Sequence, residues 1–167
     1  MERSRASLEI CNRVIRSHEF MAAGTVGAYV AMPDEVQTAL IISRAWRARK
    51  RIAIPVILGN GTMAFCSITE ETPLVRNDFG IWEPLSGDFL DAKSLDVVVT
   101  PLVAFDDDKH RIGMGGGYYD RTFRFLKNRC KWLSPKLIGL AFECQRVTSI
   151  TPNSWDIPLY KIVTEAH

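Results

Sequence analysis

The residues best suited to chemistry stand together in a glycine-rich segment that ends in two tyrosines, an acid and a base. The segment reads Arg111-Ile-Gly-Met-Gly-Gly-Gly-Tyr-Tyr-Asp-Arg121. Glycine has no side chain to hold a phosphate away from the backbone amides, and the glycines here are Gly113, Gly115, Gly116 and Gly117. A helix is expected directly after them, so its free amides and positive dipole end would add to an anion site.

Charged side chains accompany this loop. Asp120 suits a divalent cation carried by phosphates, because Mg²⁺ prefers carboxylate, phosphate and water oxygens. Lys109, Arg111 and Arg121 are placed to neutralise phosphate charge. The loop follows a predicted central strand, Leu95–Thr100, and open α/β sheets bind ligands beyond the carboxyl ends of their strands. The pattern predicts a site for a nucleoside triphosphate and magnesium.

Two familiar phosphate loops do not match this segment. A P-loop ends in Gly-Lys-Ser/Thr, whereas Gly117 is followed by Tyr118 and Tyr119. A dinucleotide fingerprint that begins at Gly113 needs a glycine where Tyr118 stands. Glycine content alone is equally typical of a flexible turn, so the specific signal is its combination with Tyr118–Arg121.

Composition indicates an ordinary globular chain. Hydrophobic residues make up 47% of its 167 residues and charged residues 24%. Lysine plus arginine number 21 against 19 acids, so the net charge of +2 does not indicate a polyanion partner, and any anion site must be local.

The cysteines and the apolar runs favour a cytoplasmic protein. The four cysteines are widely spaced without a Cys-x-x-Cys pair, which is typical of reduced thiols rather than of a zinc site: Cys11, Cys66, Cys130 and Cys144. The N-terminal residues lack the apolar region of a secretory signal, and we expect no membrane-spanning segment.

Short apolar runs alternate with helical patterns along the chain. The runs predict strands at Thr25–Ala31, Ile52–Leu58, Leu95–Thr100, Leu137–Phe142 and Tyr160–Thr164, with Thr62–Thr69 as the hairpin partner of the second. Pro55 indicates an end or an irregularity in that second strand. Residues Glu70–Asp91 are expected to be irregular, since proline and glycine recur there.

Helical spacing predicts three helices between these strands. The first ends near Phe20, the second begins at Pro33–Glu35 with Asp34 as its cap, and the third covers Tyr119–Arg129. The basic run Arg44–Arg51 is interpreted as a solvated helix end rather than a nucleic-acid surface. Together the elements predict one α/β domain over residues 1–167, with a mainly parallel sheet and helices on both faces, as in a Rossmann-like three-layer sandwich.

The segment Arg111–Arg121 resembles the signature of the 5-formyltetrahydrofolate cyclo-ligase family. Further matches follow in the family's order: Met32–Thr38, Ile54-Pro55 with Met63 and Phe65, Gly80–Pro84, Val99–Asp106, Gly139–Gln145, and Trp155–Pro158 before Val163–Glu165. The resemblance extends over nearly everything from about Leu8 onward.

The resemblance implies an enzyme that closes 5-formyltetrahydrofolate to 5,10-methenyltetrahydrofolate, with ATP as co-substrate, Mg²⁺ as cofactor, and ADP and phosphate as products. In the family scheme the formyl oxygen attacks the γ-phosphate, N10 then closes the ring, and phosphate leaves. The implied partners are these small molecules, without nucleic acid or membrane, and the chain would act as a monomer or weak homodimer.

The same resemblance assigns roles to individual residues. It implies catalytic roles for Arg111, Tyr118 and Tyr119. ATP would be bound by Arg111, Gly113, Met114, Gly115, Gly116, Gly117, Tyr118, Tyr119, Asp120 and Arg121. The folate would be bound by Val30, Glu35, Met63, Phe65, Trp82, Gly115, Gly116, Gly117 and Tyr118. Asp120 and Asp156 would share the metal ion.

Without the resemblance these residues have simpler interpretations. Glu35 is then a first-turn helix carboxylate, and Asp156 an ordinary loop acid. Met63, Phe65, Trp82 and Trp155 are then core residues, and for Trp155 we keep that expectation. His110 is expected to be a solvated loop residue, and Asp106–Asp108 a turn rather than a calcium loop.

The chain departs from the family pattern at two places. Family members usually begin with an extra basic helix that reaches the ATP phosphates, and Arg3 and Arg5 do not align with its cations. Met114 stands where a basic, aromatic or other bulky residue is common. The alternative to the ligase is therefore a catalytically weakened paralogue that binds folate or nucleotide without the N-terminal phosphate clamp. A sugar-phosphate or acyl-CoA enzyme rests on fold analogy alone and ranks below both.

Overall fold

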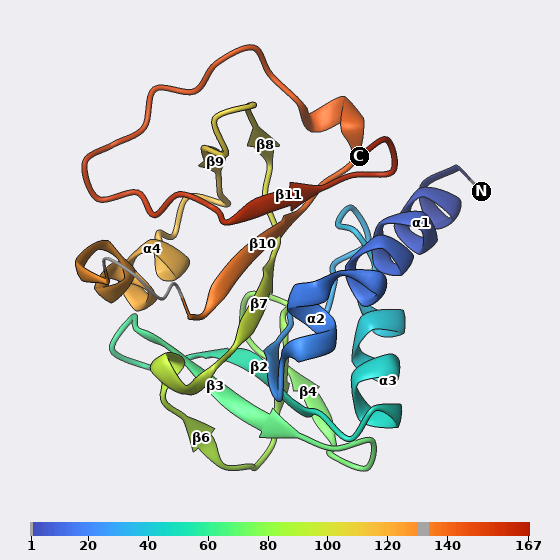
Figure 1. Cartoon of the computed structure of the whole chain (residues 1–167). Coiled ribbons are helices and arrows are strands. Elements are labelled where there is room, and N and C mark those ends of the chain that lie inside the picture. The colour runs from blue at the N-terminus through green and yellow to red at the C-terminus, as the bar shows by residue number, and fades with distance from the viewer. Residues whose placement is uncertain (1, 130–133) are drawn as a thin grey trace.

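The computed structural model describes residues 2–129 and 134–167. At its centre lies a seven-stranded sheet with the order β11-β10-β7-β1-β2-β3-β6 (Figure 1). β3 (Met63–Ile68) pairs antiparallel with β2, and β6 (Phe89–Leu90) pairs antiparallel with β3. The other neighbours are parallel, and these strands are β11 (Lys161–Val163), β10 (Lys136–Leu140), β7 (Val97–Thr100), β1 (Thr25–Gly27) and β2 (Arg51–Ile57). The predicted mainly parallel sheet is confirmed.

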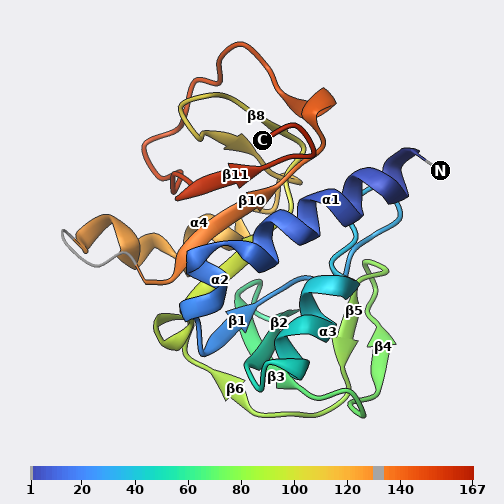
Figure 2. The same ribbon diagram turned by 45° about the vertical axis from the view of Figure 1, so that its right-hand side comes forward.

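Helices cover both faces of this sheet, as the two views show (Figures 1 and 2). One face carries α1 (Glu2–Arg16), α2 (His18–Ala22) and α3 (Ala39–Arg47), and the other carries α4 (Tyr118–Thr122) and the 3₁₀ turn η2 (Arg124–Asn128). Side chains of β7 alternate between the two cores, since Val97 and Val99 pack on the α1 side and Val98 on the α4 side. The three-layer α/β arrangement is confirmed.

Two small hairpins flank the sheet. One joins β4 (Leu74–Arg76) to β5 (Trp82–Pro84), and the other joins β8 (Ala104–Phe105) to β9 (Arg111–Ile112). The 3₁₀ turns η1 (Ala92–Ser94) and η3 (Glu143–Gln145) connect strands. The expectation that Glu70–Asp91 is irregular was therefore wrong, because β4, β5 and β6 all lie within it.

β2 continues through Pro55, where the sequence indicated an end or an irregularity. On one side β2 pairs with β1 only as far as Ala53, which is level with Gly27 at the end of β1. On the other side Pro55 pairs with Phe65 of β3. Because the parallel neighbour ends before Pro55, the missing proline amide leaves no ladder position unfilled on that side.

The helices differ from the predicted ones at their ends. The first is interrupted at Ser17, whose side chain accepts a hydrogen bond from the Phe20 amide and starts α2. The second begins at Ala39 rather than at Pro33–Glu35, so Asp34 does not cap it. The third is α-helical only over Tyr118–Thr122 and continues as the 3₁₀ turn η2 rather than as one helix to Arg129.

Three of the four cysteines lie in the described residues, and all three are free thiols, as predicted. Cys11 and Cys66 are buried and Cys144 is exposed, all three free, whereas Cys130 lies outside the described residues. No helix in the described part of the chain has the length and apolar character to cross a membrane.

Candidate active site

Two segments that carry predicted site residues follow parallel strands of the sheet. Following β7, the chain forms the β8–β9 hairpin and then the glycine loop, residues 113–117, before α4. The turn that follows β1 carries Val30 and Glu35. Carboxyl ends of parallel strands share one edge of a sheet, so both segments lie on the side where open α/β sheets bind ligands.

The backbone of the glycine loop needs its glycines. Gly115 has a φ of 94° and Gly117 a φ of 64°, which are left-handed conformations that side chains disfavour. The Arg121 guanidinium secures the loop by donating to the carbonyls of Gly116 at 2.7 Å and Gly61 at 3.2 Å. α4 has five residues, so its dipole adds little, and the loop amides are the main backbone feature that suits an anion.

Arg111 and Asp120 form an ion pair across the loop. Nη2 of Arg111 lies 3.0 Å from Oδ1 of Asp120, and their side chains are 7% and 17% exposed. Nε of Arg111 is buried without a hydrogen-bond partner among the described residues. A buried guanidinium with an unused donor is costly unless an acceptor joins it, which suits the arrival of a ligand oxygen.

A hydrogen bond brings the two predicted metal ligands into neighbouring segments. The amide of Ile157 donates to Oδ1 of Asp120 at 3.0 Å, and Ile157 directly follows Asp156. Oδ2 of Asp156 accepts from the Asn153 amide at 2.8 Å. Each carboxylate thus uses one oxygen for the protein, and its second oxygen makes no hydrogen bond to the described residues. This donor set is compatible with Mg²⁺, which takes a few carboxylate oxygens beside phosphate and water.

Glu35 lies in a tight turn rather than in a helix, so its interpretation as a first-turn helix carboxylate was wrong. Its Oε2 accepts from the Met32 amide at 2.8 Å. Burial raises the pKa of the Glu35 carboxyl above 4.5, the hydrogen bond from Met32 opposes this rise, and the nearby charge of Asp34 adds to it. A half-buried carboxylate with a free oxygen suits a ligand that brings hydrogen-bond donors.

Two tyrosines lie near this carboxylate. Burial raises the pKa of Tyr119, the Arg111 guanidinium opposes the rise, and the charge of Glu35 adds to it. Burial likewise raises the pKa of Tyr29, with smaller contributions from Glu35 and Tyr119. The Tyr119 ring lies 5.7 Å from the Arg111 guanidinium, so Glu35, Tyr119 and Arg111 belong to one neighbourhood. Tyr119 stays neutral at physiological pH and can donate its hydroxyl proton in a hydrogen bond.

The predicted apolar wall is divided between core and surface. Phe65 is 1% exposed, and its ring centroid lies 5.7 Å from that of Phe123. Met63 is half-buried on the same core, and its carbonyl accepts from the Thr122 hydroxyl at 3.4 Å. Trp82 is half-buried on β5 beneath the Arg76 guanidinium at 4.9 Å. Phe65 is therefore a core residue, whereas Met63 and Trp82 keep exposed surface with which a ligand could make contact.

Comparison with known proteins decides the family. The sequence model of the 5-formyltetrahydrofolate cyclo-ligase family matches residues 1–165. The chain belongs to this family. The 5-formyltetrahydrofolate cyclo-ligase of Haemophilus influenzae is 33% identical, and the match covers 98% of this chain and 87% of that protein. In Escherichia coli strain K12 the ligase is 37% identical over 93% of this chain and 86% of that one.

Solved structures of the family agree in fold. The 5,10-methenyltetrahydrofolate synthetase of Aquifex aeolicus has a TM-score of 0.84 at 27% identity, covering 99% of this chain and 81% of its own. That of Mycoplasma pneumoniae has a TM-score of 0.74 at 21% identity and supports the fold alone. The family match, the named relatives and the Aquifex aeolicus structure confirm the predicted family resemblance and the prediction of a ligase.

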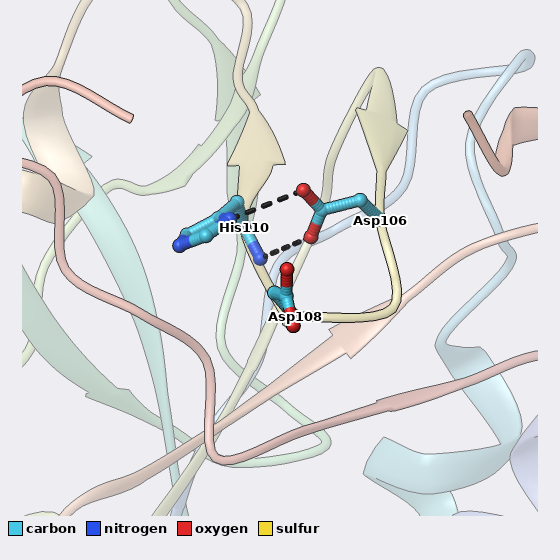
Figure 3. A group of neighbouring side chains, drawn as sticks. All are labelled: Asp106, Asp108 and His110. Atoms are coloured by element: carbon cyan, nitrogen blue, oxygen red, sulfur yellow. Dashed lines mark hydrogen bonds and ion pairs between the residues drawn. The ribbon is translucent and has the colours of Figure 1, made fainter. Parts of the chain in front are cut away.

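Besides Glu35, two further residues of this ligase-family chain differ from their sequence predictions. Trp155 was expected in the core but is 65% exposed, because the apolar residues that close the core there are Ile157 and Leu159. His110 was expected to be solvated, but its ring is half-buried and its Nδ1 lies 3.1 Å from Oδ2 of Asp106 (Figure 3). Asp107 and Asp108 form a turn, as expected for this acidic run.

Sequence reasoning missed the buried acid Asp106 and the buried Tyr29. Asp106 is 2% exposed, and Tyr29 is 4% exposed with its hydroxyl donating to the Val36 carbonyl at 2.9 Å. The signal for Asp106 was an acid directly after the apolar run Val103–Phe105 with a histidine four positions later.

Proposed function

We propose that this chain catalyses the ATP- and Mg²⁺-dependent cyclisation of 5-formyltetrahydrofolate to 5,10-methenyltetrahydrofolate, with release of ADP and phosphate. Family membership supports the folate reaction. The observation that carries the ATP half is the Arg111–Asp120 pair at the ends of the glycine loop, with Nε of Arg111 buried and unpaired among the described residues. An arginine with a spare donor beside bare amides suits phosphate oxygens.

The chemistry needs positioning and charge stabilisation rather than a protein nucleophile. The formyl oxygen attacks the γ-phosphorus, the bond to ADP breaks, and a phosphorylated imidate forms. N10 then attacks the activated carbon, phosphate leaves, and the N10 proton passes to solvent. Arg111 donates hydrogen bonds to the phosphoryl oxygens as their charge shifts, and the loop amides add further donors. Magnesium, held by Asp120 and Asp156, would neutralise triphosphate charge when bound.

Glu35 and the two tyrosines that begin α4 would orient the folate. The half-buried carboxylate of Glu35 would accept hydrogen bonds from the donor edge of the pterin, beside Val30. Neutral Tyr119 would donate its hydroxyl, and Tyr118, whose ring lies 5.0 Å from the Arg121 guanidinium, would border the loop. Met63 and Trp82 would offer apolar contact, with Phe65 supporting them from the core.

Absorbance of the methenyl product gives the direct test. Purified protein is mixed with 5-formyltetrahydrofolate, Mg²⁺ and ATP, and matched samples omit one component each. Product that requires both ATP and Mg²⁺ supports the ligase. Tight folate binding with no product would contradict it and favour the weakened paralogue.

The remaining expectations belong to the same proposal. The chain would work as one domain over residues 1–167, as a monomer or weak homodimer in the cytoplasm. It would act on small molecules and bind neither nucleic acid nor membranes. The basic run Arg44–Arg51 includes the last turn of α3, where Arg44 and Arg47 favour the negative dipole end of the helix.

A further inference from the structure

Asp106 is a buried acid whose oxygens are both in use. Oδ1 accepts from the His110 amide at 3.0 Å. Oδ2 accepts from the Ile150 amide at 2.9 Å and lies 3.1 Å from Nδ1 of His110 (Figure 3). Burial would raise the pKa of this carboxyl, but the hydrogen bonds from Ile150 and His110 together bring the pKa below its ordinary value. Asp106 is therefore an ionised acceptor inside the protein.

The donors to Asp106 come from two segments that are distant in sequence. His110 belongs to the β8–β9 hairpin, whereas Ile150 belongs to residues 146–160, here called the strap. The strap arches around the hairpin between β10 and β11 (Figures 1 and 2). Two backbone hydrogen bonds join them further, from the Val147 amide to the Phe105 carbonyl at 2.8 Å and from the Leu159 amide to the Lys109 carbonyl at 3.2 Å.

Both segments reach the candidate active site directly. Arg111, the first residue of β9, directly follows His110. The two contacts between His110 and Asp106 therefore fix the backbone position at which Arg111 begins. The strap reaches the site through Ile157, whose amide donates to Asp120 at 3.0 Å. Asp106 thus lies where the strand that carries Arg111 and the segment that supports Asp120 are held together.

A metal centre explains this cluster less well. Ligand atoms of Asp106, Asp108 and His110 lie within 4.8 Å of one another, close enough for a cation. A cation there would displace the His110 ring and the Ile150 amide from Asp106, and its third ligand, Asp108, is exposed. Satisfied hydrogen bonds to a buried carboxylate favour a structural contact instead.

We infer that Asp106 is a positioning residue: by binding His110 and the strap together, it holds Arg111 and Asp120 at the spacing that triphosphate binding requires. This inference rests on the proposed function, in which Arg111 contacts the phosphates. A displacement of about 1 Å in a positioning contact is enough to lower turnover strongly.

Hydrogen exchange tests the contact without using activity. Asp106→Asn replaces one acceptor oxygen by an amide donor. In one orientation this donor faces the Ile150 amide and the His110 ring, and in the other it faces the His110 amide, so at least one hydrogen bond is lost either way. We expect exchange at the amides of Ile150 and Ile157 to accelerate by about tenfold or more. Asp108→Asn, a neighbouring exposed acid, is the matched control and should leave both amides unchanged. Unchanged exchange in Asp106→Asn would overturn the inference.

Kinetics test the consequence for the site. His110→Ala removes the ring donor and should lower kcat/KM for MgATP by about tenfold or more, with KM for folate within about twofold of wild type. His110→Asn offers an amide donor near the position of Nδ1 and should recover most of that loss. Equal losses in the two variants, or a loss confined to the folate KM, would overturn the positioning role.

Calorimetric titration with Zn²⁺ separates this role from a metal centre. Tight binding to the wild type that both Asp106→Asn and Asp108→Asn abolish would replace the positioning role by a metal site. If the wild type makes no methenyl product at all, the proposed function fails. The exchange comparison at Ile150 and Ile157 would still decide whether Asp106 holds the hairpin to the strap.

Discussion

Arg111 and Asp120 stand at opposite ends of the glycine loop, yet Nη2 of the first lies 3.0 Å from Oδ1 of the second. The pair ties β9, which precedes the loop, to α4, which follows it. Both side chains are mostly buried, so removing either partner leaves the other charge poorly compensated. The loop, the Arg111 guanidinium and the Asp120 carboxylate therefore form one structural unit.

Arg111→Lys tests the guanidinium. Lysine offers a compact charge and cannot keep the Asp120 contact while presenting the second, separately directed donor that Nε now provides. We expect kcat/KM for MgATP to fall by about 10²-fold to 10³-fold, while folate binding by fluorescence changes little. Arg124→Lys, an exposed arginine in η2, should match the wild type in the same assay. Undiminished activity of Arg111→Lys would exclude a phosphate contact that needs the guanidinium.

Asp120→Asn tests the metal assignment. Asparagine preserves shape and can still accept from the Ile157 amide, but it removes the charge that would hold Mg²⁺. We expect turnover to fall by about 100-fold or more, and the variant to need more Mg²⁺ for half-maximal rate. Circular dichroism should show a native fold.

Asp156→Asn should likewise raise the Mg²⁺ concentration needed for half-maximal rate, because it removes the second carboxylate proposed to hold the metal. Asp78→Asn, an exposed acid of the β4–β5 turn, provides the control. Full activity of Asp120→Asn at low Mg²⁺ would show that this carboxylate does not hold the metal.

Glu35→Gln separates function from stability. The pKa of Glu35 is raised above 4.5, so at pH values between 4.5 and the raised pKa the native state holds more protons than the unfolded state. Stability must therefore fall as pH rises through that window. Glutamine carries no charge and can still accept from the Met32 amide. The variant should melt at a higher temperature than the wild type at pH 7.5, and the difference should shrink near about pH 4.

Glu35→Gln should bind folate more weakly even though it is more stable than the wild type. Loss of a charged acceptor weakens donor hydrogen bonds by about 1.5–3 kcal/mol, which corresponds to roughly a 10-fold to 100-fold higher Kd for Glu35→Gln. Fluorescence titration measures this Kd directly. A variant that melts higher and binds folate as tightly as the wild type would remove Glu35 from the folate site.

The strands were largely predictable because their signal is local. Val97–Val99 form an uninterrupted β-branched run that is buried on both faces, and the predicted central strand is there. The start of α3 was not predictable from local signals. The Tyr29 hydroxyl donates to the Val36 carbonyl and the Thr38 hydroxyl to the Tyr29 carbonyl, so these tertiary contacts hold residues 36–38 out of the helix.

The glycine loop of the candidate site was predictable from the sequence, whereas the contacts of Asp106 that hold the neighbouring segments were not. The loop glycines, Arg111 and Asp120 lie within ten residues of one another, so residue types alone indicated this candidate site. The Asp106–His110 contact depends on a turn in which Lys109 adopts a φ of 67°, uncommon for a residue with a side chain. The third donor, the Ile150 amide, arrives from 44 positions away, a distance at which sequence spacing carries no information.

Glu19 provides a pH test of the fold itself. Its Oε2 lies 2.7 Å from Nζ of Lys161, which ties α2 to β11. The hydrogen bond from Lys161 is the main reason that the pKa of Glu19 falls from 4.5 to about 2, with burial opposing it. A carboxyl with a lowered pKa stabilises the native state above the unfolded pKa, and this contribution is lost as pH falls from about 4.5 toward 2.

Glu19→Gln should therefore lower the free energy of unfolding by about 1–3 kcal/mol at pH 7, and by progressively less as pH falls toward 3. Urea titrations at several pH values measure the difference. Glu9→Gln is the matched control, since Glu9 pairs with Arg13 at 3.4 Å on an exposed face and should change stability by less than about 1 kcal/mol. A deficit for Glu19→Gln that stays constant from pH 7 to pH 3 would mean that side-chain packing rather than the Lys161 ion pair is responsible.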